Sequence, residues 1–407
     1  MSRAYPRIYV TEKARRALAG GHPWVYEGEV IRAEADIPGG SVVDVLTEKE
    51  RWLGSGVYSP HSKIRVRLIS RNTNDRFDEA FFERRIRYAV AYRKQVMGDD
   101  FDACRLIFGE ADQFPGLTVD RFGDVLVAQI LSVGMEVRKE MLFSLLVKVL
   151  GEYGVRVRAI VERNDASVRT LEGLESYSAL YSMEGLDKTF DGVTEFSENG
   201  IRYRIDCLNG QKTGFFLDQK YNRLAAAKLA KGRRVLDCFT HVGSFALNCA
   251  KGGAEHVTAV DISADAVRAG AENARMNGLS HLVDFKEADV FRLLTEMAAG
   301  KNCPFDYIIL DPPAFTKSRS TVDSAVRGYR EINRRAMSLL PRGGYLATCS
   351  CSHFMPDEKF RRMLTDAASD ASVSLRQIEA RQQAPDHPIL WTVPETDYLK
   401  FYLFQVV

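Results

Sequence analysis

Residues 235–246 read VLDCFTHVGSFA and predict a buried strand, a tight turn and the start of a helix. The apolar residues before Asp237 are typical of a parallel strand that is covered on both faces. Gly243 permits the turn, and Ser244 can cap the helix that follows. A helix start that faces the carboxyl end of a strand offers free N–H groups and a crevice for a ligand. Because a carboxylate at this strand end would repel a pyrophosphate, Asp237 predicts a ligand that carries a positive group.

Three further predicted strands also end in an acid. Residues 256–261 (HVTAVD) end at Asp261, residues 283–288 precede Asp289, and residues 305–315 (FDYIILDPPAF) contain Asp311. One acid at a strand end is often only a helix cap. Four in one alternating strand–helix series indicate a ligand site at the carboxyl ends of the strands, and the acid after the second strand normally pairs with ribose hydroxyls.

This pattern resembles the class I S-adenosylmethionine-dependent methyltransferases. The resemblance implies S-adenosyl-L-methionine as the cofactor, with Asp261 and Asp289 holding its ribose and adenine and Asp237 near its methionyl moiety. The strand–helix alternation after Arg234 predicts an α/β fold, a mostly parallel, Rossmann-like seven-stranded sheet with helices on both faces. We expect residues 399–406 to add an antiparallel strand at the edge of this sheet.

The composition of the whole chain bounds this interpretation. With 407 residues, 45% of them hydrophobic, two or three domains are expected. The formal net charge of +2 gives no strong indication of nucleic acid, so only a local basic patch would bind it. Seven cysteines, no paired metal-ligand spacing and no signal peptide predict reduced thiols in the cytoplasm and no metal site. No apolar run is long enough to cross a membrane.

The N-terminal residues predict short strands at 42–46, 54–58 and 64–69. Lys63, Arg65 and Arg67 alternate with apolar residues, so a strand would place all three cations on one face. The spacing alone fits a solvated face equally well. Residues 22–26 (HPWVY), which follow a short basic helix, resemble the start of PUA domains, which are small RNA-binding barrels. That resemblance implies that the three cations contact RNA phosphates.

We therefore expect three domains. They are a PUA-like β-barrel at 1–72, a middle α+β domain at 73–188, and the Rossmann-like methyltransferase domain, with an N-terminal hairpin, at 189–407. The evidence for the middle domain is a helix at 77–97, an apolar helix near 135–150, and strands at 125–131 and 158–163.

Residues 209–223 read NGQKTGFFLDQKYNR and follow a predicted hairpin at 196–207. The segment closely resembles one that packs against the cofactor in the methyltransferases. The resemblance implies that Lys212, Thr213, Phe215 and Asp218 lie near the cofactor. The alternative is a loop that only covers the sheet.

A predicted strand at 345–348 leads directly into CSCSH (349–353). A buried cysteine is usually only a small hydrophobic residue. Two cysteines at a strand exit, beside the strand that ends in Asp311-Pro312-Pro313, match the needs of a cytosine-C5 methyltransferase. In that reaction a thiolate adds to C6 of the base, which makes C5 nucleophilic. We expect Asp311 to stabilise the charge shift near N3 or the exocyclic amine, and the target base to be flipped or single-stranded.

The chain as a whole resembles the large-subunit ribosomal RNA methyltransferase I family, whose members methylate C5 of a cytosine in bacterial 23S rRNA. The resemblance extends to APDHP (384–388) and YLK (398–400). The family's cysteine lies in Ser-Cys-Ser, which matches Cys351, whereas Cys349 matches the Thr-Cys of other RNA cytosine-C5 enzymes. Because Pro312-Pro313 stands where those enzymes have a second cysteine, the group that removes the C5 proton is open.

Three alternatives remain: an exocyclic-amine methyltransferase, a uracil-C5 enzyme, and a non-catalytic RNA-binding protein. The sequence leaves open the target nucleotide and the oligomeric state, including a homodimer. The residues expected at the cofactor are Lys212, Thr213, Phe215, Asp218, Asp237, Phe239, Thr240, Gly243, Ser244, Asp261, Ile262, Asp289, Asp311 and Pro312.

Overall fold

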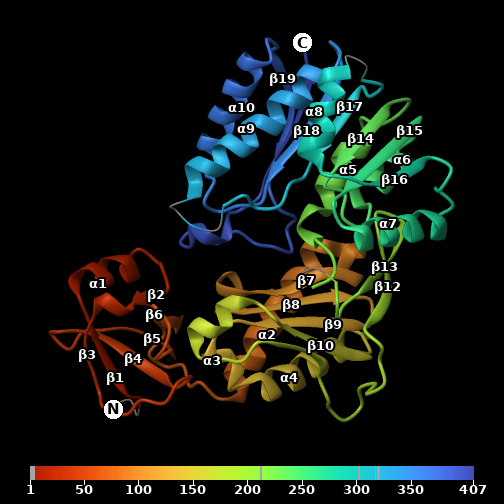
Figure 1. The fold of residues 1–407 in the computed structure, drawn as a ribbon. Coiled ribbons are helices and arrows are strands. Elements are labelled where there is room, and N and C mark those ends of the chain that lie inside the picture. Colours follow the sequence, from red (N-terminus) through yellow and green to blue (C-terminus); the bar gives the residue numbers. More distant parts are fainter. Residues whose placement is uncertain (1–4, 211–212, 301–302, 317, 319–320) are drawn as a thin grey trace. The chain divides into compact units, whose positions relative to one another are not determined.

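The structure is a computed structural model that describes residues 5–210, 213–300, 303–316, 318 and 321–407 (Figure 1). It divides into two compact units. The first contains Met1–Phe196, Ile205–Leu217 and Pro385–Thr396, and the second contains Ser197–Arg204, Asp218–Ala384 and Asp397–Val407. Each of the three larger sheets lies within one of the three expected domains. The boundaries at 72 and 188 remain predictions.

The N-terminal part of the first unit is a six-stranded sheet in the order β2-β6-β5-β4-β1-β3. Its apolar core includes Ile8, Val25, Val45 and Val66. The three strands predicted here are confirmed within two residues. The elements are β1 (Arg7–Val10), α1 (Glu12–Ala19), β2 (Trp24–Tyr26), β3 (Val30–Ala33), β4 (Val42–Thr47), β5 (Trp52–Tyr58) and β6 (Ile64–Ser70).

The middle of the chain forms a five-stranded sheet in the order β11-β10-β9-β8-β7. Its β9 and β10 are parallel and the other pairs are antiparallel. The side chain of Asp78 caps the N-terminus of α2 by accepting from the Phe81 N–H. The elements are α2 (Glu79–Met97), β7 (Ala103–Phe108), β8 (Leu117–Phe122), β9 (Val125–Ile130), α3 (Val133–Glu136), α4 (Lys139–Glu152), β10 (Ala159–Asn164) and β11 (Tyr177–Leu180).

The predicted hairpin is also present, as β12 (Val193–Glu198) and β13 (Ile201–Asp206). Its two turn residues, Asn199 and Gly200, both have positive φ angles, 54° and 71°. Asn-Gly is the dipeptide that a two-residue hairpin turn of this kind favours, because both positions require left-handed backbone. The hairpin is divided between the two units.

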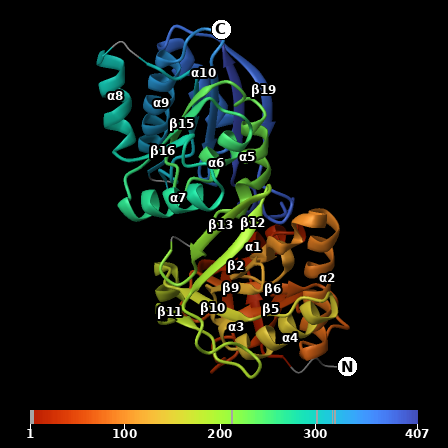
Figure 2. The ribbon, with the colours of Figure 1, turned by 90° about the vertical axis from the view of Figure 1, so that its right-hand side faces the viewer.

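The second unit is built on one large sheet with helices packed against it (Figures 1 and 2). The sheet has seven strands in the order β16-β15-β14-β17-β18-β20-β19. Strand β20 runs in the opposite direction to the other strands of this sheet, so its pairs with β18 and β19 are antiparallel and the remaining pairs are parallel. The predicted mostly parallel sheet with helices on both faces is confirmed. The elements are α5 (Lys220–Ala227), β14 (Arg234–Cys238), α6 (Ser244–Lys251), β15 (His256–Asp261), α7 (Ala264–Met276), β16 (Val283–Glu287), α8 (Val290–Gly300), β17 (Tyr307–Leu310), α9 (Val322–Leu339), β18 (Tyr345–Ser350), α10 (Asp357–Asp370), β19 (Leu375–Arg381) and β20 (Lys400–Val406).

The prediction that residues 399–406 form the edge of the sheet is wrong. Strand β20 lies between β18 and β19, and β19 is the edge. Burial explains the difference: all residues of β20 except Gln405 are buried, whereas no residue of β19 is buried. The sequence of β19, LRQIEAR, carries too few apolar residues to be recognised as a strand, which is typical of a solvated edge.

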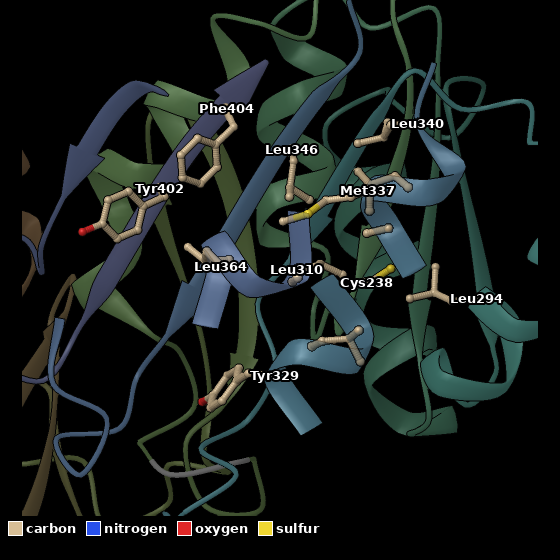
Figure 3. Close-up of a cluster of buried hydrophobic side chains, with 14 of the residues drawn as sticks. Cys238, Leu294, Leu310, Tyr329, Met337, Leu340, Leu346, Leu364, Tyr402 and Phe404 are labelled. Atoms are coloured by element: carbon tan, nitrogen blue, oxygen red, sulfur yellow. The ribbon is translucent and has the colours of Figure 1, made fainter. Parts of the chain in front are cut away.

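One face of this sheet is covered by α8, α9 and α10 (Figure 3). Leu294, Met337 and Leu364 from these helices pack with Leu310 and Leu346 from the central strands. Full burial of one such side chain contributes about 1.5–3 kcal/mol.

Helices α5, α6 and α7 lie on the other face (Figure 1). There Phe245 of α6 stacks on Phe401 of β20 with ring centroids 6.1 Å apart. The central strands are therefore fixed from both sides, which holds their carboxyl ends in place.

Within the described residues, no helix has the length and apolar character needed to cross a membrane. All seven cysteines are free thiols.

Candidate active site

Asp237 lies at the carboxyl end of β14 and is fully buried. Its Oδ2 accepts hydrogen bonds from the Thr240 hydroxyl (2.5 Å) and the Ala246 N–H (2.9 Å). Its Oδ1 is buried and has no hydrogen-bond partner among the described residues. Burial raises the pKa of Asp237 to about 7, and the charges of Asp311 and Asp261 act in the same direction. An orphaned buried acceptor in an acidic setting suits a ligand that donates from a positive group.

The turn after β14 has an unusual backbone. Phe239 and His241 have positive φ angles of 63° and 52°, which non-glycine residues rarely adopt. Gly243 has φ 83°, and a Cβ there would lie 2.7 Å from the ring of Phe285, so the turn requires glycine. The prediction that Ser244 caps α6 is wrong: Gly243 is the N-cap and Ser244 is the first helical residue. The reason is that Asp237 already accepts from the Ala246 N–H.

Asp261 at the end of β15 accepts the His241 N–H on Oδ2 (2.9 Å) and the Ser263 N–H on Oδ1 (3.0 Å). Each carboxylate oxygen can accept a second hydrogen bond, so the group can still bind a diol. Ile262, the next residue, is 70% exposed. Such an exposed apolar side chain beside an acid suits contact with the face of a heterocycle. Asp289 is exposed and caps α8 through the Arg292 N–H (2.9 Å), so it has the ordinary capping role whether or not it also contacts a ligand.

Asp311 at the end of β17 is held by a chain of amide contacts. Gln219 Nε2 donates to Asp311 Oδ1 (3.1 Å), and Gln219 Oε1 accepts from Asn222 Nδ2 (2.7 Å). Arg381 Nε donates to Asn222 Oδ1 (3.0 Å). Burial, followed by the charge of Asp218, raises the pKa of Asp311 to about 6. Gln219 was not predicted as a site residue, although it belongs to the quoted FFLDQ segment.

Asp218 is buried in the second unit, where the Tyr398 hydroxyl donates to its Oδ2 (2.6 Å). Thr213 and Phe215 belong to the first unit. There Thr213 donates to Asp120 Oδ2 (2.6 Å) and Phe215 packs on Phe196 with ring centroids 5.0 Å apart. Their contact with the cofactor stays a prediction, and Lys212 lies outside the described residues.

Cys349 does not follow β18, as was expected, but lies inside it. The strand continues to Ser350 because β20 pairs with it up to that residue, with Phe401 opposite Cys349. Cys349 is fully buried, and burial followed by the Asp311 charge raises its pKa well above the ordinary value. This thiol is therefore held in its neutral form.

Cys351 is the first residue after β18 and is half-buried. Its Sγ lies 3.9 Å from the carbonyl oxygen of Pro312, so the strand exit and the Asp-Pro-Pro segment meet at this thiol. Pro312 is itself buried and follows Asp311 directly. The two predicted catalytic cysteines thus differ: Cys349 is enclosed and Cys351 is accessible.

Lys400 is a charged residue beside Cys351 to which the sequence analysis gave no role. It is buried, and its Nζ donates to the carbonyls of Ser352 (2.6 Å) and Tyr398 (2.8 Å). Burial lowers its pKa to about 8, while the charges of Asp397, Cys351 and Asp357 act in the opposite direction. The signal in the sequence was a lysine at the start of an otherwise apolar strand, KFYLFQV.

Lys63, which precedes β6, and Arg65 and Arg67 within it do not share an exposed face. Arg67 is buried and donates to Glu172 Oε1 at 2.8 Å, so an RNA track that includes Arg67 is wrong. The physical reason is that a carboxylate from residues 167–172, remote in sequence, covers this face. Arg65 is paired with Glu27, and Lys63 is exposed. RNA contacts of Lys63 and Arg65 stay predictions.

Comparisons with known proteins agree with this geometry. Residues 174–405 match the family of S-adenosylmethionine-dependent methyltransferases, and residues 8–71 match the PUA-like domain family. The chain is 37% identical over 405 residues, 99% of each chain, to a ribosomal RNA large subunit methyltransferase I from Klebsiella pneumoniae strain 342. It is also 37% identical over 404 residues, 98% of this chain and 99% of the other, to a protein of the same name from Escherichia coli O157:H7.

Two solved structures share the fold over 98% of this chain and 100% of theirs, at 21% identity. One, from Streptococcus mutans, is described as a SAM-dependent methyltransferase and has a TM-score of 0.81. The other is a methyltransferase structure in complex with SAH, with a TM-score of 0.82.

The residues at the strand ends fit this cofactor. The orphaned Oδ1 of Asp237 suits its ammonium group, the remaining capacity of Asp261 suits a ribose diol, and Ile262 offers an apolar surface for adenine. The chain therefore uses S-adenosylmethionine and belongs to the ribosomal RNA large subunit methyltransferase I family of methyltransferases.

Proposed function

We propose that this enzyme methylates C5 of a cytosine in 23S ribosomal RNA through a covalent bond between Cys351 and C6 of the base. The observation that carries the proposal is the position of Cys351, half-buried at the end of β18, 3.9 Å from the Pro312 carbonyl and beside the buried Lys400. The relatives at 37% identity are named for the large subunit RNA, which supports the same class of substrate. The free thiols are in keeping with a cytoplasmic site of action.

The cofactor would be held at the ends of β14, β15 and β16. Asp237 would accept hydrogen bonds from its ammonium group, Asp261 from its ribose, and Asp289 from its adenine amine, with Ile262 against the adenine ring. When bound, S-adenosylmethionine supplies an electrophilic methyl group on a sulfonium. The acidic set of Asp218, Asp237 and Asp311 favours that positive charge over a neutral ligand.

Cys351 would start the reaction as a thiolate. Its sulfur bonds to C6 of the cytosine, and the electron pair of the C5–C6 double bond moves toward N3. The electron-rich C5 would then take the methyl group, whose bond to the sulfonium sulfur breaks and leaves neutral S-adenosylhomocysteine. Loss of the C5 proton to a base and cleavage of the C6–S bond restore the double bond and the Cys351 thiolate. The nearby Lys400 ammonium favours the thiolate over the thiol.

Asp311 would act as the general acid that protonates N3. Since its pKa is raised to about 6, this carboxyl is mostly ionised near neutral pH but takes up a proton more readily than an ordinary aspartate. It can donate that proton to N3 as the thiolate adds and take it back on elimination. Gln219, which is oriented by Asn222, fixes the carboxyl in position.

Product analysis tests this function. The enzyme is incubated with unmodified 23S rRNA and S-adenosylmethionine labelled in the methyl group, and the RNA is digested to nucleosides. We expect the label in 5-methylcytidine. Label in N4-methylcytidine would favour the exocyclic-amine reaction, and label in 5-methyluridine would favour the uracil reaction. No transfer, with cofactor and RNA both bound, would favour a non-catalytic RNA-binding protein.

A further inference from the structure

The first unit contains a cavity of about 430 Å³ to which the function above assigns no role. Its lining comes from segments far apart in the sequence, and every lining residue belongs to this unit. A second cavity of about 390 Å³ shares Asn72, Asp75, Arg85 and Gln113 with it. Arg85 therefore projects from α2 into a groove that extends to both sides of it.

Two cations in this groove have no carboxylate partner. Arg85 and Arg71 form no ion pair with any described residue. The Nε of Arg85 is buried without a hydrogen-bond partner in the described part of the chain, and its guanidinium lies 4.6 Å from the centroid of the Phe81 ring. Burial lowers the pKa of Arg85 to about 10, so the group remains a cation at neutral pH. Arg85 is half-buried and Arg71 is exposed, with one hydrogen bond to the His22 carbonyl (3.4 Å), so an anion from a ligand would stabilise both cations.

The acids of the groove are already engaged. Asp75 pairs with Arg84 at 3.0 Å, and Asp112 accepts two hydrogen bonds from Arg93 at 2.5 and 2.7 Å. Glu110 accepts from the Trp24 indole at 3.1 Å, and burial raises its pKa, which favours its neutral form. The charges that remain to attract a ligand are therefore the two arginines.

An exposed indole lies at the side of this groove. Trp391 is 94% exposed, and its sequence neighbours Leu390 and Thr392 both line the larger cavity. The turn that carries it is fixed by hydrogen bonds from the Leu390 N–H to the Thr396 hydroxyl (2.9 Å) and from the Val393 N–H to the Leu390 carbonyl (2.7 Å). Folding normally buries an indole, so a fixed turn that presents one to solvent indicates a surface for a planar ligand.

We infer that this groove binds a single-stranded segment of the substrate RNA, with phosphates on Arg71 and Arg85 and a base stacked on Trp391. Cations that can contact the phosphate backbone and an exposed aromatic ring on which a base can stack are the two elements of single-strand recognition. The inference rests on the proposed function only in that the strand belongs to the same RNA. Binding is measured without S-adenosylmethionine, so failure of the two proposals can be distinguished.

The test uses the full chain and ten-nucleotide single-stranded fragments of 23S rRNA. RNA should quench the Trp391 fluorescence, and Trp391→Ala should weaken binding by about 5- to 150-fold through the lost stacking. Trp391→Phe should restore most of the affinity. The paired change Arg71→Gln with Arg85→Gln should lower the slope of log K against log salt by about 0.7 for each lost phosphate contact. Tyr153→Ala, an exposed ring at the end of α4, is the matched control and should leave binding unchanged.

The proposal that this groove binds RNA is contradicted if Trp391→Ala binds the single strand with wild-type affinity. It is also contradicted if the double arginine variant keeps the wild-type slope of log K against log salt. If Trp391→Ala lost as much affinity for a fully paired RNA duplex as for the single strand, that would also contradict the proposal, because a duplex does not offer a free base to Trp391. As a control for folding, each variant should have the same midpoint of thermal unfolding and the same affinity for S-adenosylmethionine as the wild type. Should Trp391 govern RNA binding while the product is not 5-methylcytidine, the groove stands and the proposed reaction fails.

Discussion

The ammonium of Lys400 donates a 2.6 Å hydrogen bond to the carbonyl of Ser352, the residue that follows Cys351. Lys400 also stands opposite Ser350 in the pairing of β18 with β20. Lys400 is therefore held by contacts with Ser350 and Ser352, the two residues that flank Cys351 in the sequence. Among the described residues, no carboxylate forms an ion pair with Lys400, and its charge interacts at longer range with Asp397, Cys351 and Asp357.

Replacing Lys400 with Met should slow the alkylation of Cys351 by iodoacetamide at pH 7.5 by about tenfold, because the thiolate loses a nearby positive charge. The rate is measured by mass spectrometry of the peptide that contains Cys351. Cys303, which is also half-buried, serves as the internal reference. Lys400→Gln keeps a donor for the Ser352 carbonyl without the charge and should be slow as well. A wild-type rate in both variants would leave Lys400 with a structural role only.

The affinity for S-adenosylmethionine should rise with pH. Asp237 and Asp311 have pKa values raised to about 7 and about 6, so both are largely protonated at pH 5.5 and ionised at pH 7.5. A cationic ligand binds the ionised form, which predicts a gain of up to about tenfold per pH unit for each group. Calorimetry in two buffers of different ionisation enthalpy should detect proton release near pH 6.5. Asp237→Asn should weaken binding and flatten this profile; proton uptake in the wild type would refute the assignment.

The ligand-free protein should respond to pH in the opposite direction. A carboxyl whose pKa is raised in the folded state stabilises the fold below its unfolded pKa and loses that contribution as pH rises through the folded pKa. For Asp237 this window extends from about pH 4 to about pH 7. The free energy of unfolding in urea should therefore fall across this window in the wild type by more than in Asp237→Asn. Parallel curves for the two proteins would contradict the raised pKa.

Asp261→Ala should weaken S-adenosylmethionine binding by roughly 1.5–3 kcal/mol, the loss expected for hydrogen bonds to a charged acceptor. The fold should remain intact, because the two hydrogen bonds to Asp261 come from half-buried backbone N–H groups in the turns after β14 and β15 and not from the core of the sheet. Calorimetry measures the affinity. Asp289→Ala is a useful comparison. Because Asp289 is exposed, its replacement should reduce the binding free energy of S-adenosylmethionine by less. Unchanged affinity in Asp261→Ala would remove this residue from the cofactor site.

The sequence predicted what depends on local pattern. Alternation of apolar strands and amphipathic helices predicted the seven-stranded sheet, and Asn199-Gly200 predicted the hairpin turn. It failed where a partner remote in sequence decides the outcome. The sequence around Arg67 fits an exposed strand face, because its buried ion-pair partner, Glu172, is remote in sequence. Cys349 was expected after the end of the strand, because the local sequence does not show the pairing with β20 that encloses it.

The same limit applies inside the site. Asp237 and Asp311 stand out as acids at the ends of apolar strands, a signal carried by each strand alone. The roles of Gln219 and Lys400 depend on contacts with Asp311 and Ser352, which only the folded chain brings close.

Trapping the covalent intermediate tests the central claim most directly. RNA with 5-fluorocytosine at the target should form an adduct with the enzyme that survives denaturation and requires S-adenosylmethionine, because fluorine cannot leave C5 as the proton does. Cys351→Ala should abolish both the adduct and turnover while cofactor binding is nearly unchanged, and Cys349→Ala should keep the adduct and lower activity modestly through packing. An adduct that persists in Cys351→Ala, or one that is lost only in Cys349→Ala, would contradict the assignment of Cys351 as the nucleophile.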